Sequence, residues 1–246
     1  MTQADAQPVA DAVRSFADLR RFAEENAGRV AQGEGDAFLG ARALMPLPQG
    51  PVTIGVIRLE AGSGEVEAMP ADEFLIAHQG SVELEVEGQA LPLAEGGSVV
   101  LTKGARVRWK ALAPAILLFM RKDGGPAGAA RGIAIDEQAE LVASGAPLAE
   151  LLVGPTPSCR NHTDYLSEDG VFICGTWDST PYHRRAMRYG HYELMHLLQG
   201  SVTFIDETGR QGTFVKGDIF LLEQGAMASW ESREDVKKVY AIYRPA

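Results

Sequence analysis

The stretch that decides the fold is ELMHLLQGSV at residues 193–202, which nearly repeats EFLIAHQGSV at residues 73–82. The second copy begins 120 residues after the first (73 against 193). The same offset aligns three pairs of glycines and, after one inserted residue, a pair of tryptophans: Gly50 with Gly170, Gly55 with Gly175, Gly97 with Gly217, and Trp109 with Trp230. A shared offset over so many landmarks indicates that one unit was duplicated. Function should therefore be sought in a pocket that was built twice, and in the differences between the copies.

Length and charge limit the classes of protein to consider. A chain of 246 residues fits one large domain or two small ones, and the repeat favours two. The formal charge of −10, with Lys and Arg scattered, argues against nucleic acid as a partner. No apolar run is long enough to span a bilayer, and the first residues lack the basic and apolar regions of a secretion signal. Two cysteines, Cys159 and Cys174, are too few for a disulfide framework and fit a reducing cytoplasm.

The pattern of apolar residues predicts an all-β protein. Ser15 is placed to cap a helix over residues 15–29, and residues 33–51 read as a loop. From residue 52 onward, short strand-like segments alternate with Gly-rich turns, over residues 52–59, 73–78, 82–86, 98–101, 116–119, 171–177, 191–198, 202–206, 212–215, 219–222 and 236–243. Two short helices are expected over 137–143 and 148–153. Such a series of strands is typical of an antiparallel sandwich or barrel, and the absence of strand–helix alternation argues against a doubly wound sheet.

The repeat divides the chain into four parts. We expect an N-terminal tail, helix and loop over residues 1–49, followed by a first domain over residues 50–122. A partly helical linker over residues 123–164 then leads to a second domain over residues 165–246.

Two features in each copy resemble the motifs of the cupin superfamily. The first is a glutamate seven residues before a glycine, Glu73 before Gly80 and Glu193 before Gly200. The second is a turn ahead of an apolar strand, GSVVL at 97–101 and GDIFLL at 217–222. The second copy is most similar to the branch that contains ureidoglycine aminohydrolase-like and ethanolamine-utilisation cupins. Its elements follow that branch's order: GTWDSTP at 175–181, Glu193, Gly200, Gly217-Asp218, Gly225, Trp230 and VKKVY at 236–240. The resemblance covers about residues 50–120 and 165–245 and implies two tandem jelly-roll-like β-barrels, a bicupin, that form a homodimer.

The resembled metal site is not preserved in this sequence. It uses imidazoles and one carboxylate, a set suited to Mn, Fe, Ni or Zn. The second copy keeps the carboxylate as Glu193, but the histidine positions fall on other residues: Ala186, Arg188 and Ala228, or Met187 and Tyr189 with the shorter gap. In the first copy they fall on Val66, Ala68 and Val107, or on Glu67 and Met69. We therefore expect no cofactor, with a divalent transition metal as the alternative.

A displaced metal site would draw on the remaining histidines of the second copy. The residues to test are His183, His191, Glu193 and His196. His191 and Glu193 share one face of a strand, whereas His196 points to the opposite face. A metal that used both Glu193 and His196 would need a β-bulge between them.

Without a metal, Glu193 needs another reason to face a barrel interior. A buried carboxylate is costly unless it is paired or protonated, and Arg188 and Lys238 are the candidate counter-charges. Such a pair is either structural or part of a ligand clamp, in which Glu193 accepts from an amine or hydroxyl group. Ligand-binding candidates beside them are Trp177, Tyr182, His191, Trp230 and Tyr240. In the first copy Ile57 and Gly62 replace Trp177 and Tyr182, so we place function in the second half.

Three hypotheses remain for the function. The first is a module that binds a small polar metabolite in the second barrel without a metal. The second is an enzyme, metal-dependent or metal-independent, that acts on an amine or ureide with Glu193 as the acid or base. The third is a structural protein that uses the cupin fold only to dimerise. Loss of the histidines favours binding, while the groups around Glu193 argue against a purely structural role. The sequence carries no nucleophile elbow, phosphate-binding loop or dinucleotide fingerprint.

Overall fold

The computed structural model describes residues 13–30 and 35–245, which form two compact units. Of the described residues, unit 1 contains Val13, 21–30 and 35–134, and unit 2 contains 14–20 and 135–245. The chain passes from unit 1 to unit 2 between Ala134 and Ile135, inside the segment that we expected to be the linker. Among the described residues, no helix is long and apolar enough to cross a membrane.

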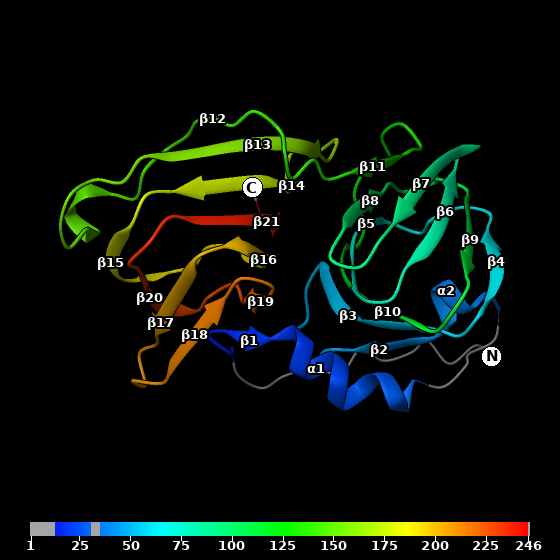
Figure 1. The fold of residues 1–246 in the computed structure, drawn as a ribbon, viewed down its shortest axis with the longest axis horizontal. Coiled ribbons are helices and arrows are strands. Elements are labelled where there is room, and N and C mark those ends of the chain that lie inside the picture. The colour runs from blue at the N-terminus through cyan, green and yellow to red at the C-terminus, as the bar shows by residue number, and fades with distance from the viewer. Residues whose placement is uncertain (1–12, 31–34, 246) are drawn as a thin grey trace. The chain divides into compact units, whose positions relative to one another are not determined.

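Unit 1 is a sandwich of two antiparallel sheets (Figure 1). Its strands are β2 (Arg42–Leu44), β3 (Val52–Leu59), β4 (Gly62–Val66), β5 (Asp72–Gln79), β6 (Val82–Val86), β7 (Gln89–Leu93), β8 (Ser98–Leu101), β9 (Val107–Ala111), β10 (Ala115–Lys122) and β11 (Gly132–Ala134). One sheet has the order β11-β8-β5-β10-β3-β2 and the other the order β4-β9-β6-β7. Apolar side chains such as Leu75, Trp109 and Phe119 fill the space between the two sheets.

Unit 2 repeats this architecture with a larger main sheet (Figure 1). Its strands are β1 (Ala17–Asp18), β12 (Val142–Ala143), β13 (Cys159–Leu166), β14 (Phe172–Ser179), β15 (Tyr182–Arg188), β16 (Tyr192–Gln199), β17 (Ser201–Ile205), β18 (Gln211–Val215), β19 (Ile219–Leu222), β20 (Met227–Ser232) and β21 (Val236–Tyr243). The main sheet has the order β1-β19-β16-β21-β14-β13-β12, and the second sheet has the order β15-β20-β17-β18. The core between them contains Phe204, Phe220 and Trp230.

The repeated sequence forms the central strand of each main sheet. β5 lies between β8 and β10, and β16 lies between β19 and β21. A strand buried on both faces is expected to be largely apolar, which accounts for FLIA at residues 74–77 and for LMHL at residues 194–197, where only His196 is polar. The QGSV turn that follows needs its glycine. Gly200 has φ +76°, and an added Cβ would lie 2.3 Å from the Asp235 carbonyl oxygen.

The N-terminal region departs from the predicted helix over residues 15–29. Residues 17 and 18 form β1 against β19, and only then do α1 (Leu19–Asn26) and the 3₁₀ helix η1 (Ala27–Arg29) follow. The Asp18 carboxylate accepts a hydrogen bond from the Arg20 backbone N–H at 2.9 Å, so Asp18 takes the capping place that we gave to Ser15. Phe16 is buried in the core of unit 2, which draws this segment into the sheet.

The predicted loop and linker helices are also corrected. The loop expected over 33–51 extends into residues outside the described part, and its described portion contains α2 (Ala37–Gly40) and β2. Of the linker helices, the one expected over 137–143 ends in strand β12, which pairs with β13. The one expected over 148–153 is reduced to the 3₁₀ helix η2 (Ala149–Leu151). β13 begins at Cys159, so pairing with β14 turns the end of the predicted linker into a strand of unit 2.

Asp36 connects three parts of unit 1 through one carboxylate. It accepts hydrogen bonds of 2.8 Å from the Phe38 N–H at the start of α2, the Glu65 N–H of β4 and the Trp109 indole N–H of β9. Asp36→Ala is expected to lower the free energy of unfolding of unit 1 by about 2 kcal/mol, because three donors lose their acceptor. Urea unfolding followed by circular dichroism measures the loss. Asp36→Asn keeps one acceptor oxygen and should lose less, and an alanine variant as stable as the wild type would contradict this role.

Candidate functional site

A buried ion pair lies on the inner face of the main sheet of unit 2. The Lys238 ammonium of β21 lies 2.8 Å from Glu193 Oε1 of the neighbouring strand β16. His191 Nε2 lies 3.3 Å from the other carboxylate oxygen, Oε2. The Lys238 and Glu193 side chains are only 7% and 9% exposed, so the pair is largely removed from water. The sequence left Arg188 and Lys238 open as counter-charges, and Lys238 is the residue that meets Glu193.

Aromatic rings surround the ammonium group of this pair. Lys238 Nζ lies 4.7 Å from the centre of the Trp177 ring and 5.1 Å from that of Trp230. Tyr182 stacks on Trp230 with ring centres 5.5 Å apart and planes 9° apart. Ring faces attract cations, so the aromatic side chains and Glu193 together fix the position of the Lys238 ammonium group.

The surroundings of Glu193 keep it ionised. Burial by itself would raise the pKa of Glu193, but the charge of Lys238 and the hydrogen bond with His191 outweigh burial and hold that pKa well below its ordinary value. Glu193 is therefore a carboxylate at neutral pH and acts as a hydrogen-bond acceptor. A carboxyl group that stays ionised is a poor general acid.

The ion pair faces a cavity of about 490 Å³. Its wall comes from alternate residues of four adjacent strands and from one connecting segment: Asn161, Thr163, Ile173, Trp177, His191, Glu193, Lys238, Tyr240, Ile242, Arg244, Ser144 and Gly145. Burial falls steadily along β21, from Lys238 and Tyr240, which are buried, through Ile242, which is half-buried, to Arg244, which is exposed. The cavity therefore has a closed end at the ion pair and an open end at Arg244.

Five of the predicted site residues line this cavity together. They are Trp177, His191, Glu193, Lys238 and Tyr240. Trp230 is buried behind Lys238, and Tyr182 stacks behind Trp230, so these two support the wall rather than form it. Arg188 lies exposed on β15 and does not line the cavity.

Sequence reasoning missed several cavity residues. Asn161 and Thr163 lie on β13, in the part of the chain that was read as linker, and Arg244 follows the last strand. Tyr240 connects the missed polar groups to the predicted ones, because its hydroxyl lies 3.3 Å from Thr163 Oγ1. The available signal was spacing, since Asn161 and Thr163 are two residues apart, as are Tyr240, Ile242 and Arg244.

The histidines do not assemble into a displaced metal site. His183 lies on the other sheet, in register with Glu231 of β20. His196 is buried on the face of β16 opposite Glu193, where burial, and then the charge of Arg20, lower the pKa of His196 to about 4. Within residues 13–30 and 35–245, no group of three or more His, Cys, Asp or Glu side chains is placed to hold a metal ion. The residues present therefore do not fit the metal site that the cupin resemblance implies.

The equivalent place in unit 1 is filled by an arginine. Arg42 of β2 donates two hydrogen bonds to the Glu73 carboxylate, at 2.6 and 2.9 Å, and its guanidinium lies 4.5 Å from the centre of the Phe119 ring. The side chains are 7% and 0% exposed, so this carboxylate is sealed.

Register shows which substitutions separate the two units. Arg42 and Leu117 both pair with Ile57 in unit 1, where Asn161 and Lys238 both pair with Trp177 in unit 2. The large Arg42 is thus replaced by the short Asn161, and the apolar Leu117 by Lys238. These two exchanges open the interior of unit 2 and change its charge.

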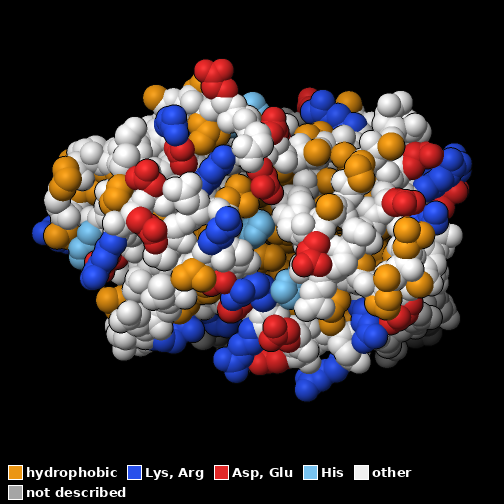
Figure 2. Space-filling model, viewed as in Figure 1, with side chains coloured by type: hydrophobic (Ala, Val, Ile, Leu, Met, Phe, Trp, Pro, Cys, Tyr) orange, Lys and Arg blue, Asp and Glu red, His pale blue; other side chains and the backbone are white. Residues whose placement is uncertain are grey.

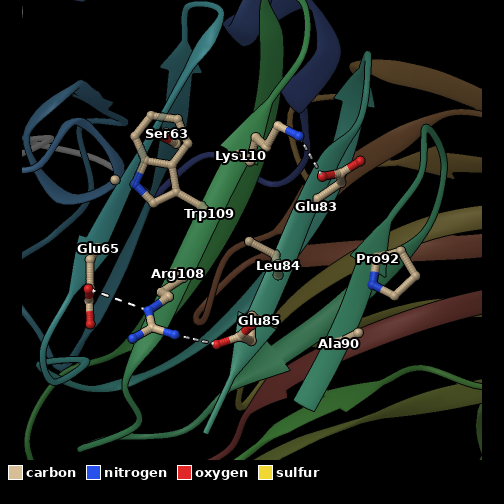
Figure 3. A pocket seen from close by; sticks show the side chains of 11 residues that line it. Ser63, Glu65, Glu83, Leu84, Glu85, Ala90, Pro92, Arg108, Trp109 and Lys110 are labelled. Atoms are coloured by element: carbon tan, nitrogen blue, oxygen red, sulfur yellow. Dashed lines mark hydrogen bonds and ion pairs between the residues drawn. The ribbon is translucent and has the colours of Figure 1, made fainter. Parts of the chain in front are cut away.

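A second hollow, of about 720 Å³, lies on the outer face of the four-stranded sheet of unit 1 (Figure 3). Arg108 reaches Glu85 at 2.8 Å and Glu65 at 3.5 Å, and Lys110 lies 3.5 Å from Glu83. These charges already have partners and are exposed, where an ion pair contributes little. On the side of the molecule that Figure 2 shows, side chains of both charges are likewise mixed. The cavity with the buried pair is the better candidate site.

Comparisons with known proteins agree with this architecture. The family model described as EutQ-like cupin domain matches residues 47–116 and 166–240. A crystal structure of a protein with unknown function from Pseudomonas syringae pv. tomato is 30% identical, with a TM-score of 0.79, and the match covers 86% of this chain and 92% of that one. No curated protein matches the chain.

More distant solved structures share the fold alone. The protein Ylba from E. coli is 12% identical with a TM-score of 0.58, and the match covers 96% of this chain and 95% of that one. A salicylate 1,2-dioxygenase from Pseudaminobacter salicylatoxidans is 12% identical with a TM-score of 0.57, over 96% of this chain and 86% of that one.

Proposed function

Since the chain belongs to the family of EutQ-like cupin domains and carries two copies of that domain, we propose that it binds a small polar metabolite inside unit 2 without the usual three-histidine metal site. The observation that carries the proposal is the Glu193–Lys238 pair at the closed end of a cavity of about 490 Å³. Pockets for small molecules commonly occupy about 300–1,000 Å³ and combine apolar walls with a few placed polar groups. Unit 2 has this composition, whereas the matching place in unit 1 is sealed by Arg42.

The polar groups of the cavity offer both kinds of hydrogen bond. A carboxylate has about four acceptor positions, so Glu193 can accept from a ligand beside its bonds to Lys238 and His191. Lys238 has three N–H donors, of which one meets Glu193 and another approaches Met195 Sδ at 3.1 Å. The third is available for a ligand oxygen. The rings of Trp177 and Tyr240 supply apolar wall for the rest of the molecule.

An enzyme that acts on an amine or ureide, with or without a metal, is the alternative. The low pKa of Glu193 disfavours it as a general acid and makes it a weak base. Elemental analysis of protein purified without a metal-affinity tag separates the two functions: binding as proposed expects no stoichiometric transition metal, whereas one metal per chain favours the metal-dependent enzyme. The homodimer and the cytoplasmic location expected from the sequence stay predictions.

Filling the cavity should abolish binding. Asn161→Arg places in unit 2 the residue that seals unit 1, whereas Asn161→Ser keeps the cavity open at the same position. A mixed library of small polar metabolites, screened by thermal shift, is expected to give hits that stabilise the wild type and Asn161→Ser but not Asn161→Arg. At a ligand concentration of about 100 Kd the expected stabilisation is about 2.7 kcal/mol. Hits that shift all three proteins equally would show that binding does not use this cavity.

A further inference from the structure

We propose that the ligand of the unit 2 cavity is an organic carboxylate, whose carboxylate group pairs with Arg244 while an oxygen-bearing group deeper in the molecule meets Glu193 and Lys238. This inference rests on the proposed binding function and names the chemical class of the ligand. It is carried by the charges along the cavity wall and by the contrast between the two units.

The cavity wall carries one positive charge in excess. Its charged side chains are Glu193, Lys238 and Arg244. Glu193 is already matched by Lys238 at 2.8 Å. Among the described residues, the guanidinium of Arg244 makes no ion pair, although its backbone N–H donates to the Val171 carbonyl. The unmatched charge at the open end is therefore positive, and an anionic group is its natural partner.

A cationic ligand group cannot pair with Glu193 as Arg42 pairs with Glu73, because Lys238 already occupies that position in unit 2. In unit 1 the Glu73 carboxylate pairs with the Arg42 guanidinium, and the position equivalent to Lys238 is occupied by the uncharged Leu117. In unit 2 the ammonium of Lys238 occupies the carboxylate and the aromatic cage. An ammonium or guanidinium ligand beside Glu193 would face the like charge of Lys238 at short range. Lys238 thus supplies the positive charge that pairs with Glu193, and a ligand does not need a cationic group to bind there.

The spacing along the strands suits a compact molecule. Lys238 Nζ contacts both Glu193 and Met195, which are in register with Ile242 and Tyr240, so the ammonium lies between the levels of these two residues. Arg244 follows Ile242 by two residues and Tyr240 by four, which corresponds to about 7 to 14 Å along an extended strand. A carboxylate at Arg244 and a hydroxyl or carbonyl oxygen at Lys238 are thus separated by the length of a single ring or a short chain. The side chains of Ile173, Trp177 and Ile242 flank that path with apolar surface.

Three probes of nearly equal shape test the inference in the full chain. They are 4-hydroxybenzoate, 4-hydroxybenzamide and 4-hydroxybenzylamine, which present an anion, a neutral amide and a cation on the same phenol. Isothermal titration is expected to show the carboxylate binding at least about tenfold more tightly than either of the others. Arg244→Gln should weaken that binding by about tenfold and remove its salt dependence, since an exposed charge is screened by salt. Arg233→Gln, which removes an arginine that is 85% exposed and absent from the cavity wall, is the matched control and should bind like the wild type.

The outcomes separate this inference from the proposed function. Equal or tighter binding of the amide or the amine, or unchanged affinity in Arg244→Gln, overturns the carboxylate. The carboxylate inference also fails if no probe binds at millimolar concentration while hits from the metabolite library still require an open cavity. In that case the proposed function stands. If no probe binds and no library hit depends on Asn161, both the inference and the proposed function fail.

Discussion

Arg42→Met is expected to lower the free energy of unfolding of unit 1 by about 3–5 kcal/mol, because it leaves the Glu73 carboxylate buried without its counter-charge. Glu73 is 0% exposed and both of its oxygens accept from Arg42, so water cannot replace the lost partner without opening the sandwich. The variant also removes the guanidinium from the Phe119 ring. Urea unfolding followed by tryptophan fluorescence reports this loss, since Trp109 is the tryptophan of unit 1.

Two control variants isolate the buried charge as the cause. Arg42→Met combined with Glu73→Leu removes both charges and should recover most of the stability, because apolar residues of similar volume can replace a buried pair at little cost. Arg58→Met removes an arginine that is 40% exposed and pairs with the exposed Glu60, so it should cost less than about 1 kcal/mol. If Arg42→Met were as stable as Arg58→Met, the Arg42–Glu73 pair would not be what closes unit 1.

Lys238→Met is expected to reverse the pH dependence of the stability of unit 2. In the wild type the folded-state pKa of Glu193 is lowered, so its stabilising effect is present above the unfolded carboxyl pKa of about 4.3 and is lost as the pH falls through the folded value. Without Lys238, burial raises the pKa of Glu193, and the ionised group destabilises the fold at neutral pH. The expected cost at pH 7 is about 3–5 kcal/mol, which diminishes as the pH falls and Glu193 takes up a proton.

The test is whether the stability of Lys238→Met approaches that of the wild type as the pH falls. Thermal unfolding at pH 7 and pH 5 should show the variant recovering stability relative to the wild type at the lower pH. Adding Glu193→Gln to Lys238→Met removes the titrating group, and this double variant should follow the wild type across that range. A Lys238→Met variant that keeps the same difference from the wild type at both pH values would rule out an uncompensated Glu193 as the cause.

The sequence predicted most inner strands of the two main sheets, but it missed β9 and β20, which are inner strands of the four-stranded sheets, and most outer strands. β3, β6, β8, β19 and β21 have the predicted boundaries, because strands with buried faces need apolar runs or strict alternation. β4, with the sequence GSGEV, and β7, with QALPL, carry glycine, proline and charge, so their extended form depends on partners rather than on their own residues. β13 was hidden in the same way, because CRNHTDYL is a polar segment that becomes a strand by pairing with β14.

The candidate site was predictable where it follows strand alternation. Glu193 and its neighbours on β16 and β21 fall on one face by simple spacing, and aromatic residues nearby were visible in the sequence. The position of Arg188 was not predictable, because the pairing of β15 with β20 shifts register between Arg184 and Met187. Arg184, before this irregularity, is buried and donates a hydrogen bond to the Tyr189 hydroxyl, whereas Arg188, after it, faces solvent. No residue type in the sequence marks the shift.

The duplicated repeat therefore provides two scaffolds, and of the two repeated glutamates only Glu193 lines a cavity in the described part of the chain. Arg42 closes the first unit on Glu73, and the exchange to Asn161 and Lys238 opens the second. Native mass spectrometry of the full chain with hits from the metabolite library measures this asymmetry most directly, in two double variants that each remove one ion pair. We predict one ligand per chain for the wild type and for Arg42→Met with Glu73→Leu, and none for Lys238→Met with Glu193→Leu. Two ligands per chain in the wild type, or binding that survives loss of the Glu193–Lys238 pair, would contradict a single cavity centred on that pair.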